Sequence, residues 1–180
     1  MKKIFLITIA VSLSLLAYAQ HDDHDHSGTA VSINNEGFNS IKKLVGDWKG
    51  TFKWTGGRSS QGAMDARYYL TGNGTAVVED LINDGNIVMT SVYHLDGPDL
   101  RVTHYCAAGN QPRLKAGAFN DESKSVVFQF VDITNLASPG TPHVSGLELR
   151  FADIDKLAII FTFTASGMES FEQIDLTRAK

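Results

Sequence analysis

The segment from Leu100 to Arg113 holds the side chains best suited to chemistry. If this segment is a strand, alternation places four side chains on one face: Leu100, Val102, His104 and Cys106. The two apolar residues predict that this face points into a core, so His104 would be an interior imidazole with a thiol two residues away. Such a pair could ligate a metal or haem iron, or act as an acid–base group. The alternative is a neutral, hydrogen-bonded histidine beside a small apolar cysteine.

Three further polar residues follow in a stretch punctuated by glycine and proline: Asn110, Gln111 and Arg113. Their amide and guanidinium groups could line the mouth of a binding site and hold a carboxylate. A solvated loop with one surface arginine is the alternative.

Glu79 is a candidate for a carboxylate that points inward. It shares a strand face with Val77 and Leu81. A buried carboxylate needs a partner, and Arg67 is the candidate. A surface ion pair between Glu79 and Arg67 explains the pattern equally well.

A cluster of histidines and aspartates occurs near the N-terminus, and residues 20–37 are polar without any periodicity. This composition predicts a disordered leader. His21, His24 and His26 are ligand types that zinc or copper prefers, and they predict a weak, exchangeable metal site. A solvated tail without a role is the alternative, because binding would have to order a flexible segment.

Composition and missing motifs exclude several classes of function. The chain contains no Gly-x-Ser-x-Gly, Gly-x-x-x-x-Gly-Lys or Cys-x-x-Cys-His sequence. Its formal net charge of −4 is poorly suited to nucleic acid or to anionic membrane surfaces. A single cysteine, Cys106, cannot form an internal disulfide.

Residues 1–19 have the three-part form of a secretory signal peptide. Residues 1–3 carry two lysines, residues 4–16 are almost wholly apolar, and residues 17–19 (Ala-Tyr-Ala) suit cleavage before Gln20. The apolar run of about 13 residues is shorter than the roughly 20 that a membrane-spanning helix needs. We therefore expect a mature chain exported without a membrane span, to the periplasm of a Gram-negative cell or to the exterior.

The remaining chain, residues 38–180, reads as one all-β domain. Phe38, Ile41 and Leu44 have the spacing of a short helix. From Asp47 the apolar period becomes two, and further strands are expected near nine segments: 63–71, 75–82, 86–95, 100–107, 113–119, 125–133, 143–152, 157–165 and 169–177. Tight turn signals such as Asn73-Gly74 separate them. About ten consecutive strands favour a single up-and-down antiparallel β-barrel, with a β-sandwich as the alternative.

The helix that runs into Gly46-Asp47-Trp48 resembles the start of calycin-type barrels, which include lipocalins, fatty-acid-binding proteins and nitrobindin-like proteins. The resemblance covers residues 38–180 and implies that Trp48 plugs one end of the barrel. Residues 103–113 are also similar to a run in secreted bacterial barrels, for which no activity follows. The calycin resemblance implies small apolar ligands, although the same fold also hosts enzymes.

Three functions are compatible with this pattern. The first is a barrel that binds a small hydrophobic or amphipathic ligand, with an apolar wall formed by five residues: Met89, Phe128, Phe130, Phe161 and Phe163. The alternative is that these residues fill the core and leave no cavity. The second is a lyase, isomerase or cyclase that uses His104 as its acid–base group. The third is an interaction protein of the cell envelope.

Haem is a narrower form of the ligand hypothesis. The nitrobindin-like pattern takes its iron-binding histidine from late in the chain, but no histidine follows His143 here. Only His104 or His143 could substitute, and the cofactor stays unassigned.

Overall fold

The computed structural model describes residues 34–180. The predicted signal peptide (residues 1–19) and the three histidines of the predicted metal site, His21, His24 and His26, lie outside the described residues. Among residues 34–180, no helix is long and apolar enough to cross a membrane. The same range contains no cluster of three or more His, Cys, Asp or Glu side chains that could hold a metal ion.

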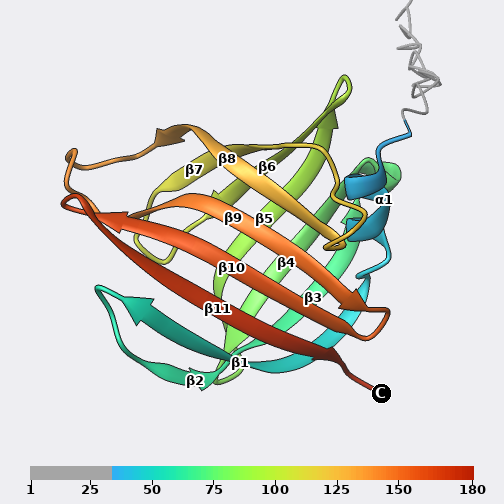
Figure 1. Cartoon of the computed structure of the whole chain (residues 1–180), viewed down its shortest axis with the longest axis horizontal. Coiled ribbons are helices and arrows are strands. Elements are labelled where there is room, and N and C mark those ends of the chain that lie inside the picture. The colour runs from blue at the N-terminus through green and yellow to red at the C-terminus, as the bar shows by residue number, and fades with distance from the viewer. Residues whose placement is uncertain (1–33) are drawn as a thin grey trace, which may run out of the picture. The chain divides into compact units, whose positions relative to one another are not determined.

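The described chain begins with a short helix, α1 (Glu36–Lys42), that starts slightly before the predicted position. The Asn35 side chain caps it by accepting a hydrogen bond from the Phe38 backbone N–H at 2.9 Å. Phe38 and Ile41 are buried, because their spacing places both on one face of the helix. That face packs into the hydrophobic core at one end of the barrel (Figure 1).

Eleven strands follow in chain order: β1 (Gly46–Gly56), β2 (Gln61–Ala63), β3 (Asp65–Thr71), β4 (Ala76–Asn83), β5 (Asn86–Asp96), β6 (Asp99–Tyr105), β7 (Gln111–Ala116), β8 (Ser125–Thr134), β9 (His143–Asp153), β10 (Lys156–Ala165) and β11 (Met168–Arg178). A single 3₁₀ turn, Gly72–Gly74, joins β3 to β4. Strands β2 and β3 both pair with β1, so they act as one interrupted strand.

The strands form a closed antiparallel barrel of ten strands, which confirms the predicted fold. From β3 to β11 each strand pairs with its neighbour in the chain. Strand β11 then pairs with β1, from Trp48 opposite Arg178 to Gly56 opposite Ser170. Strands β8 and β9 are also paired neighbours, so residues 135–142 form a hairpin loop and provide no crossover for a sandwich. Closure leaves no long edge exposed.

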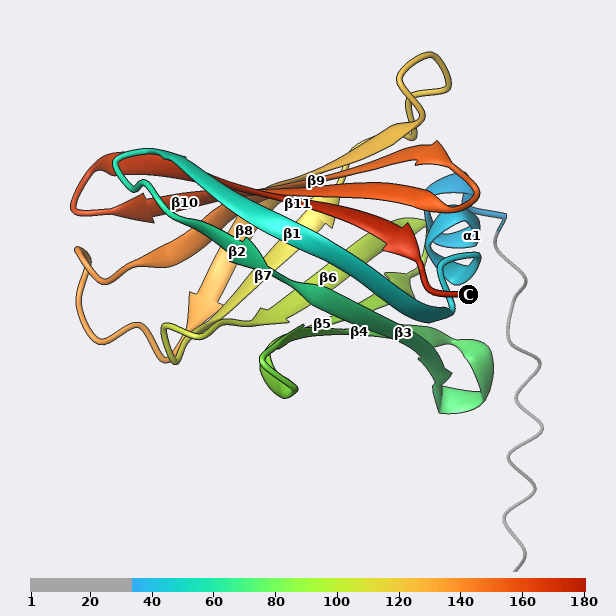
Figure 2. The same ribbon diagram turned by 90° about the horizontal axis from the view of Figure 1, so that it is seen from below.

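Trp48 lies at the end of the barrel beside α1. Its ring is buried, and its Nε1–H donates to the Leu44 carbonyl oxygen at 2.8 Å. The Arg178 guanidinium lies 4.4 Å from the centre of the indole ring and donates to the carbonyl oxygens of Lys43 and Val45. Figure 2 shows the C-terminus beside α1 at this end. The beginning and the end of the described domain therefore lie close together near Trp48.

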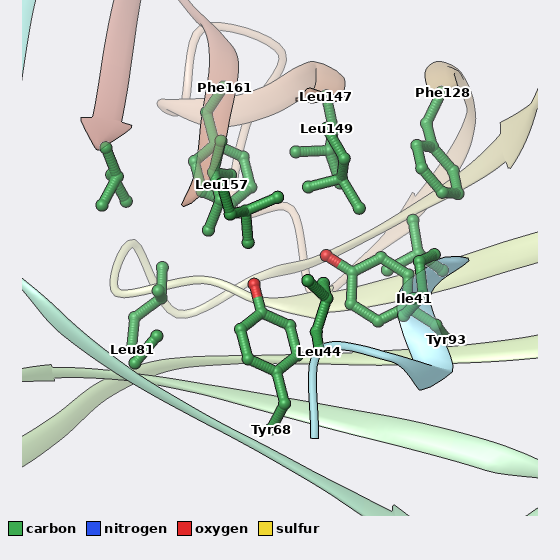
Figure 3. Packing of buried hydrophobic residues seen from close by; sticks show 14 of the residues in the cluster. Ile41, Leu44, Tyr68, Leu81, Tyr93, Phe128, Leu147, Leu149, Leu157 and Phe161 are labelled. Atoms are coloured by element: carbon green, nitrogen blue, oxygen red, sulfur yellow. The ribbon is translucent and has the colours of Figure 1, made fainter. Parts of the chain in front are cut away.

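The barrel interior is mostly apolar but contains several hydroxyl groups. Leu81, Leu149, Ile159 and other alternating residues form one continuous hydrophobic cluster. Figure 3 shows the rings of Tyr68 and Tyr93 among these leucines, with both hydroxyl groups inside the barrel. Buried hydroxyls need partners, so the interior must also contain acceptors.

Candidate functional site

The barrel holds an open cavity of about 460 Å³ at the end opposite α1. Its lining comes from strands β1, β5, β9, β10 and β11 and from the segment directly after β6, which ends at Tyr105. These parts meet at one end because neighbouring strands are antiparallel. Most of the lining is aromatic, aliphatic or sulfur-containing: Phe52, Trp54, Met64, Val88, Met89, Cys106, Val144, Phe161 and Phe163. This composition is typical of a pocket for a small molecule.

Four of the residues singled out in the sequence line this cavity: Met89, Cys106, Phe161 and Phe163. Cys106 lies on the same inward face as His104, as the alternation predicts. Burial raises the pKa of its thiol above the ordinary value, so the thiol is neutral near pH 7. Phe163 meets Trp54 edge to face, with ring centroids 5.5 Å apart.

The other two phenylalanines of the predicted wall do not line the cavity. Phe128 is buried deeper in the core, with its ring 5.9 Å from that of Tyr93. Phe130 is 40% exposed and its ring lies 5.7 Å from His143. The expected wall therefore included too much of β8, whose pairing with β7 shifts by one residue directly after Phe130, at Val131.

Arg113 does not reach the cavity, which corrects the expectation that it lines the barrel mouth. It belongs to strand β7, where Pro112 and Leu114 are buried and Arg113 is exposed. Its Nη2 donates to Asp132 at 2.8 Å on the outer surface. The sequence analysis expected the strand to begin at residue 113, but β7 begins at Gln111. It therefore did not predict which residues of β7 face outward.

Neither Asn110 nor Gln111 lines the cavity, but Asn110 supports its rim. The buried Asn110 side chain donates to the Pro142 carbonyl oxygen at 2.9 Å, and its backbone carbonyl accepts from the Cys106 N–H at 3.0 Å. Both Pro142 and Cys106 line the cavity. Gln111 accepts a hydrogen bond from the Thr134 hydroxyl at 2.9 Å, away from the cavity lining. Asn110 thus positions two segments of the lining.

His104 is fully buried beneath the cavity. Its Nδ1 lies 2.9 Å from the Ser91 hydroxyl oxygen, and its ring lies 4.9 Å from that of the cavity-lining Phe161. Its Nε2 has no hydrogen-bond partner in residues 34–180. Burial lowers the pKa of His104 to about 4, because a charged imidazole loses its hydration there. His104 is therefore neutral at physiological pH.

Glu79 points inward, but its partners are tyrosines. Its Oε2 accepts hydrogen bonds from the hydroxyls of Tyr68 at 2.5 Å and Tyr93 at 3.0 Å. Burial raises the pKa of Glu79 above its ordinary value, against the hydrogen bonds that favour its charged form. Arg67, the expected partner, is exposed and pairs with Asp47 at 3.0 Å. The two tyrosine hydroxyls donate hydrogen bonds to the Glu79 carboxyl group without adding a second buried charge.

Glu79, Ser91 and His104 lie directly opposite one another on β4, β5 and β6. A serine hydroxyl bonded to an imidazole is the pairing used in nucleophilic catalysis. All three side chains are fully buried, however, and none lines the cavity. The arrangement cannot meet a substrate in this structure, so it gives no support to catalysis by His104.

Neither histidine is placed to ligate a haem iron in the cavity. Neither His104 nor His143 lines the cavity. The His104 ring contacts that of the cavity-lining Phe161, and His143 Nδ1 lies 2.9 Å from the Thr141 carbonyl oxygen. A histidine-ligated haem does not fit these residues.

The sequence analysis missed the two charged residues of the cavity, Glu172 and Arg58. Glu172 is 4% exposed, and burial raises its pKa to about 7, although Trp54 and Arg58 favour the charged form. The Arg58 guanidinium lies 4.8 Å from the Trp54 ring centroid and 4.4 Å from that of Phe163. One signal was present: Glu172 alternates in phase with the buried Ile174.

Comparison with known proteins identifies the fold. No protein-family model matches the sequence, and no curated protein matches it. The structure is similar to that of Rv2717c from M. tuberculosis, with a TM-score of 0.55 and 15% identity over 80% of this chain and 98% of that chain. It is also similar to a protein of unknown function from the DUF3598 family (Npun_R4044) of Nostoc punctiforme, with a TM-score of 0.53 and 11% identity over 77% of this chain and 49% of that chain.

These likenesses agree with the closed antiparallel topology of ten strands. At such low identities the comparison shows the fold alone. The function must therefore be argued from the cavity itself.

Proposed function

We propose that this chain is an exported binding protein that holds a small amphipathic molecule in the cavity at the open end of its barrel. The cavity carries the proposal. Its volume of about 460 Å³ lies within the range of roughly 300–1,000 Å³ that is usual for small-molecule sites. Its aromatic and methionine lining would hold an apolar body, and the charged Arg58 and Glu172 would meet a polar group.

The single cysteine provides a direct test of occupancy, because Cys106 lines the cavity. We expect 1-octanol, a neutral amphipathic probe, to slow the alkylation of Cys106 by N-ethylmaleimide in a saturable way. The occupant would shield the thiol without reacting with it. Mass spectrometry of the intact protein would follow the reaction.

A matched pair of variants controls this experiment. Val144→Phe enlarges a side chain that lines the cavity, whereas Val127→Phe enlarges one that is exposed outside it. We expect Val144→Phe to abolish the protection by 1-octanol and Val127→Phe to retain it. Unchanged alkylation at every probe concentration in the unmodified protein would contradict the proposal.

The natural ligand can be sought without any assumption about its identity. A native mass spectrum and an absorbance scan of the protein, purified from the cells that make it, should show a stoichiometric added mass that is lost on denaturation. A clean mass of the protein alone, combined with no protection of Cys106, would argue against a carrier.

Export to the periplasm, or to the exterior, is part of the same proposal and rests on the pattern of residues 1–19. N-terminal sequencing of the purified protein should begin at Gln20. A chain that keeps Met1 and remains in the cytoplasmic fraction would refute export without affecting the argument from the cavity.

A further inference from the structure

Glu172 is the only acidic side chain among the residues that line the cavity. It is 4% exposed, and within residues 34–180 no ion pair joins it to a lysine, arginine or histidine. Trp54 and Arg58 favour its charged form only in part, because burial still raises the pKa of Glu172. A buried carboxylate without a close ion pair is costly, and such groups often occur where a ligand or a reaction uses them. A positively charged ligand group in the cavity would therefore be stabilised by the Glu172 carboxylate.

The side chains around Glu172 favour a positive charge as well. Trp54 lies opposite Glu172 in the β1–β11 ladder, and Phe161 lies opposite it in the β10–β11 ladder. Phe52 and Phe163 complete the aromatic part of the lining. Aromatic faces attract cations, and they do so more strongly where water is excluded.

Arg58 shows that this surface accepts a cation. It lies in the segment between β1 and β2, and its exposed guanidinium lies over the rings of both Trp54 and Phe163. No ion pair within 4 Å joins Arg58 to a carboxylate in the described part of the chain. The guanidinium is thus held by the aromatic pair, in the position that the positive group of a ligand would favour.

We propose that the cavity selects organic cations, such as a protonated primary amine on an apolar chain, with Glu172 as the countercharge and Trp54 and Phe163 as the aromatic contacts. This inference rests on the proposed function, because it names the class of ligand for the same cavity. The ligand's ammonium group competes with the Arg58 guanidinium for the aromatic pair and gains the Glu172 carboxylate.

The affinity for such a cation depends on pH. Because the pKa of Glu172 is about 7, its carboxylate is mostly neutral at pH 6 and mostly charged at pH 8. The nearby Cys106 thiol stays neutral over this range, because burial raises its pKa. An alkylamine also stays protonated, with a pKa near that of lysine, about 10.4. Affinity for the amine therefore rises from pH 6 to pH 8.

Three probes with the same chain and different head groups test the inference: octylamine, 1-octanol and octanoate. Calorimetric titration at pH 8 should show octylamine binding about tenfold more tightly than 1-octanol, and octanoate more weakly than both. At pH 6 the advantage of octylamine over 1-octanol should fall several-fold. Glu172→Gln should abolish that advantage, so that octylamine and 1-octanol bind with about equal affinity.

Two further variants separate the roles of the charged residues. Glu169→Gln removes an exposed carboxylate on the same strand and should change nothing. Arg58→Ala removes the competing cation and should raise the affinity for octylamine.

The outcomes of these titrations distinguish a failure of the proposed function from a failure of this inference alone. If none of the probes binds, both the proposed function and this inference fail. If octanoate binds best, or if Glu172→Gln leaves the ratio of octylamine to 1-octanol unchanged, the cavity binds amphipathic molecules but does not select cations, and this inference alone is overturned.

Discussion

At the scale of single residues, burial decides which chemistry is available. His104 and Cys106 lie on one inward face, but only Cys106 lines the cavity. His104 is fully buried and hydrogen-bonded to Ser91, so its imidazole contributes to the core. The charged groups that do line the cavity are Glu172 and Arg58.

The buried His104 should make the protein less stable in acid. In the unfolded chain its pKa is near 6.5, whereas in the fold it is about 4. Below pH 6.5 the unfolded state therefore binds a proton that the folded state does not, and stability falls as the pH drops toward 4. The full loss is about 3 kcal/mol, at 1.36 kcal/mol per pKa unit.

We expect the stability of His104→Gln to lack this dependence on pH. Denaturant unfolding at several pH values measures it, because the difference in unfolding free energy between the native protein and the variant should shrink as the pH falls from 6.5 to 4. Parallel stability curves for the two proteins would show that His104 is not buried in its neutral form.

Glu172 should have the opposite effect on stability. Its folded pKa of about 7 lies above its ordinary value of 4.5, so the folded state prefers the neutral acid. Above pH 4.5 the unfolded chain loses a proton that the fold retains, and stability falls as the pH rises toward 7. The cost reaches about 3 kcal/mol at pH 8.

Glu172→Gln removes this cost and should stabilise the protein at pH 8 by up to about 3 kcal/mol. The gain should vanish below pH 4.5, where both states hold a neutral acid. Urea unfolding at pH 4 and pH 8 measures both values, with Glu169→Gln as the exposed control. Equal stability of Glu172→Gln and the native protein at pH 8 would place the Glu172 carboxylate in water.

At the scale of the elements, the contact between β1 and β11 closes the barrel and builds the cavity. Gly50 lies in this contact, where a Cβ atom would come within 2.0 Å of the Asp175 carbonyl oxygen. Two backbones can approach this closely only where one residue lacks a side chain.

Gly50→Ala should therefore destabilise the protein by about 3 kcal/mol or more, because the strands must separate. Gly117→Ala is the matched control, since the nearest atom would be 3.7 Å from the new Cβ, and it should change stability by less than about 1 kcal/mol. Thermal unfolding followed by circular dichroism would measure both. A Gly50→Ala variant as stable as the control would mean that β1 and β11 are not in close contact.

At the scale of the whole molecule, the barrel has one closed end and one open end. α1, Trp48 and Arg178 pack together at the first, and the cavity opens at the second. A ligand that binds only the folded state stabilises it according to its concentration relative to Kd.

We expect 1-octanol at one hundred times its Kd to stabilise the fold by about 2.7 kcal/mol. For a domain of this size that raises Tm by on the order of 5 to 10 °C. Differential scanning fluorimetry would show the shift in Val127→Phe but not in Val144→Phe. An equal shift in both variants would place the binding outside the cavity.

Much of the barrel followed from local pattern. A period of two identifies strands, and tight turns such as Asn73-Gly74 separate them, because both signals depend on residues close in the chain. The structure buries His104 on β6 and buries Cys106 directly after the end of that strand, which is shorter than the expected 100–107. The alternation failed at Arg113, because the start of β7 at Gln111 was not recognised and the phase of that strand was lost.

The composition of the cavity depended on contacts between distant parts of the chain. Trp54, Arg58 and Glu172 come together only when β11 closes on β1, and no local pattern records that pairing. The partners of Glu79 were decided in the same way, by tyrosines from β3 and β5 that reach the same point inside the barrel. Sequence alone therefore determined the type and order of the strands, because those depend on nearby residues. Closure of the barrel decided which side chains are buried together, and so what the cavity can bind.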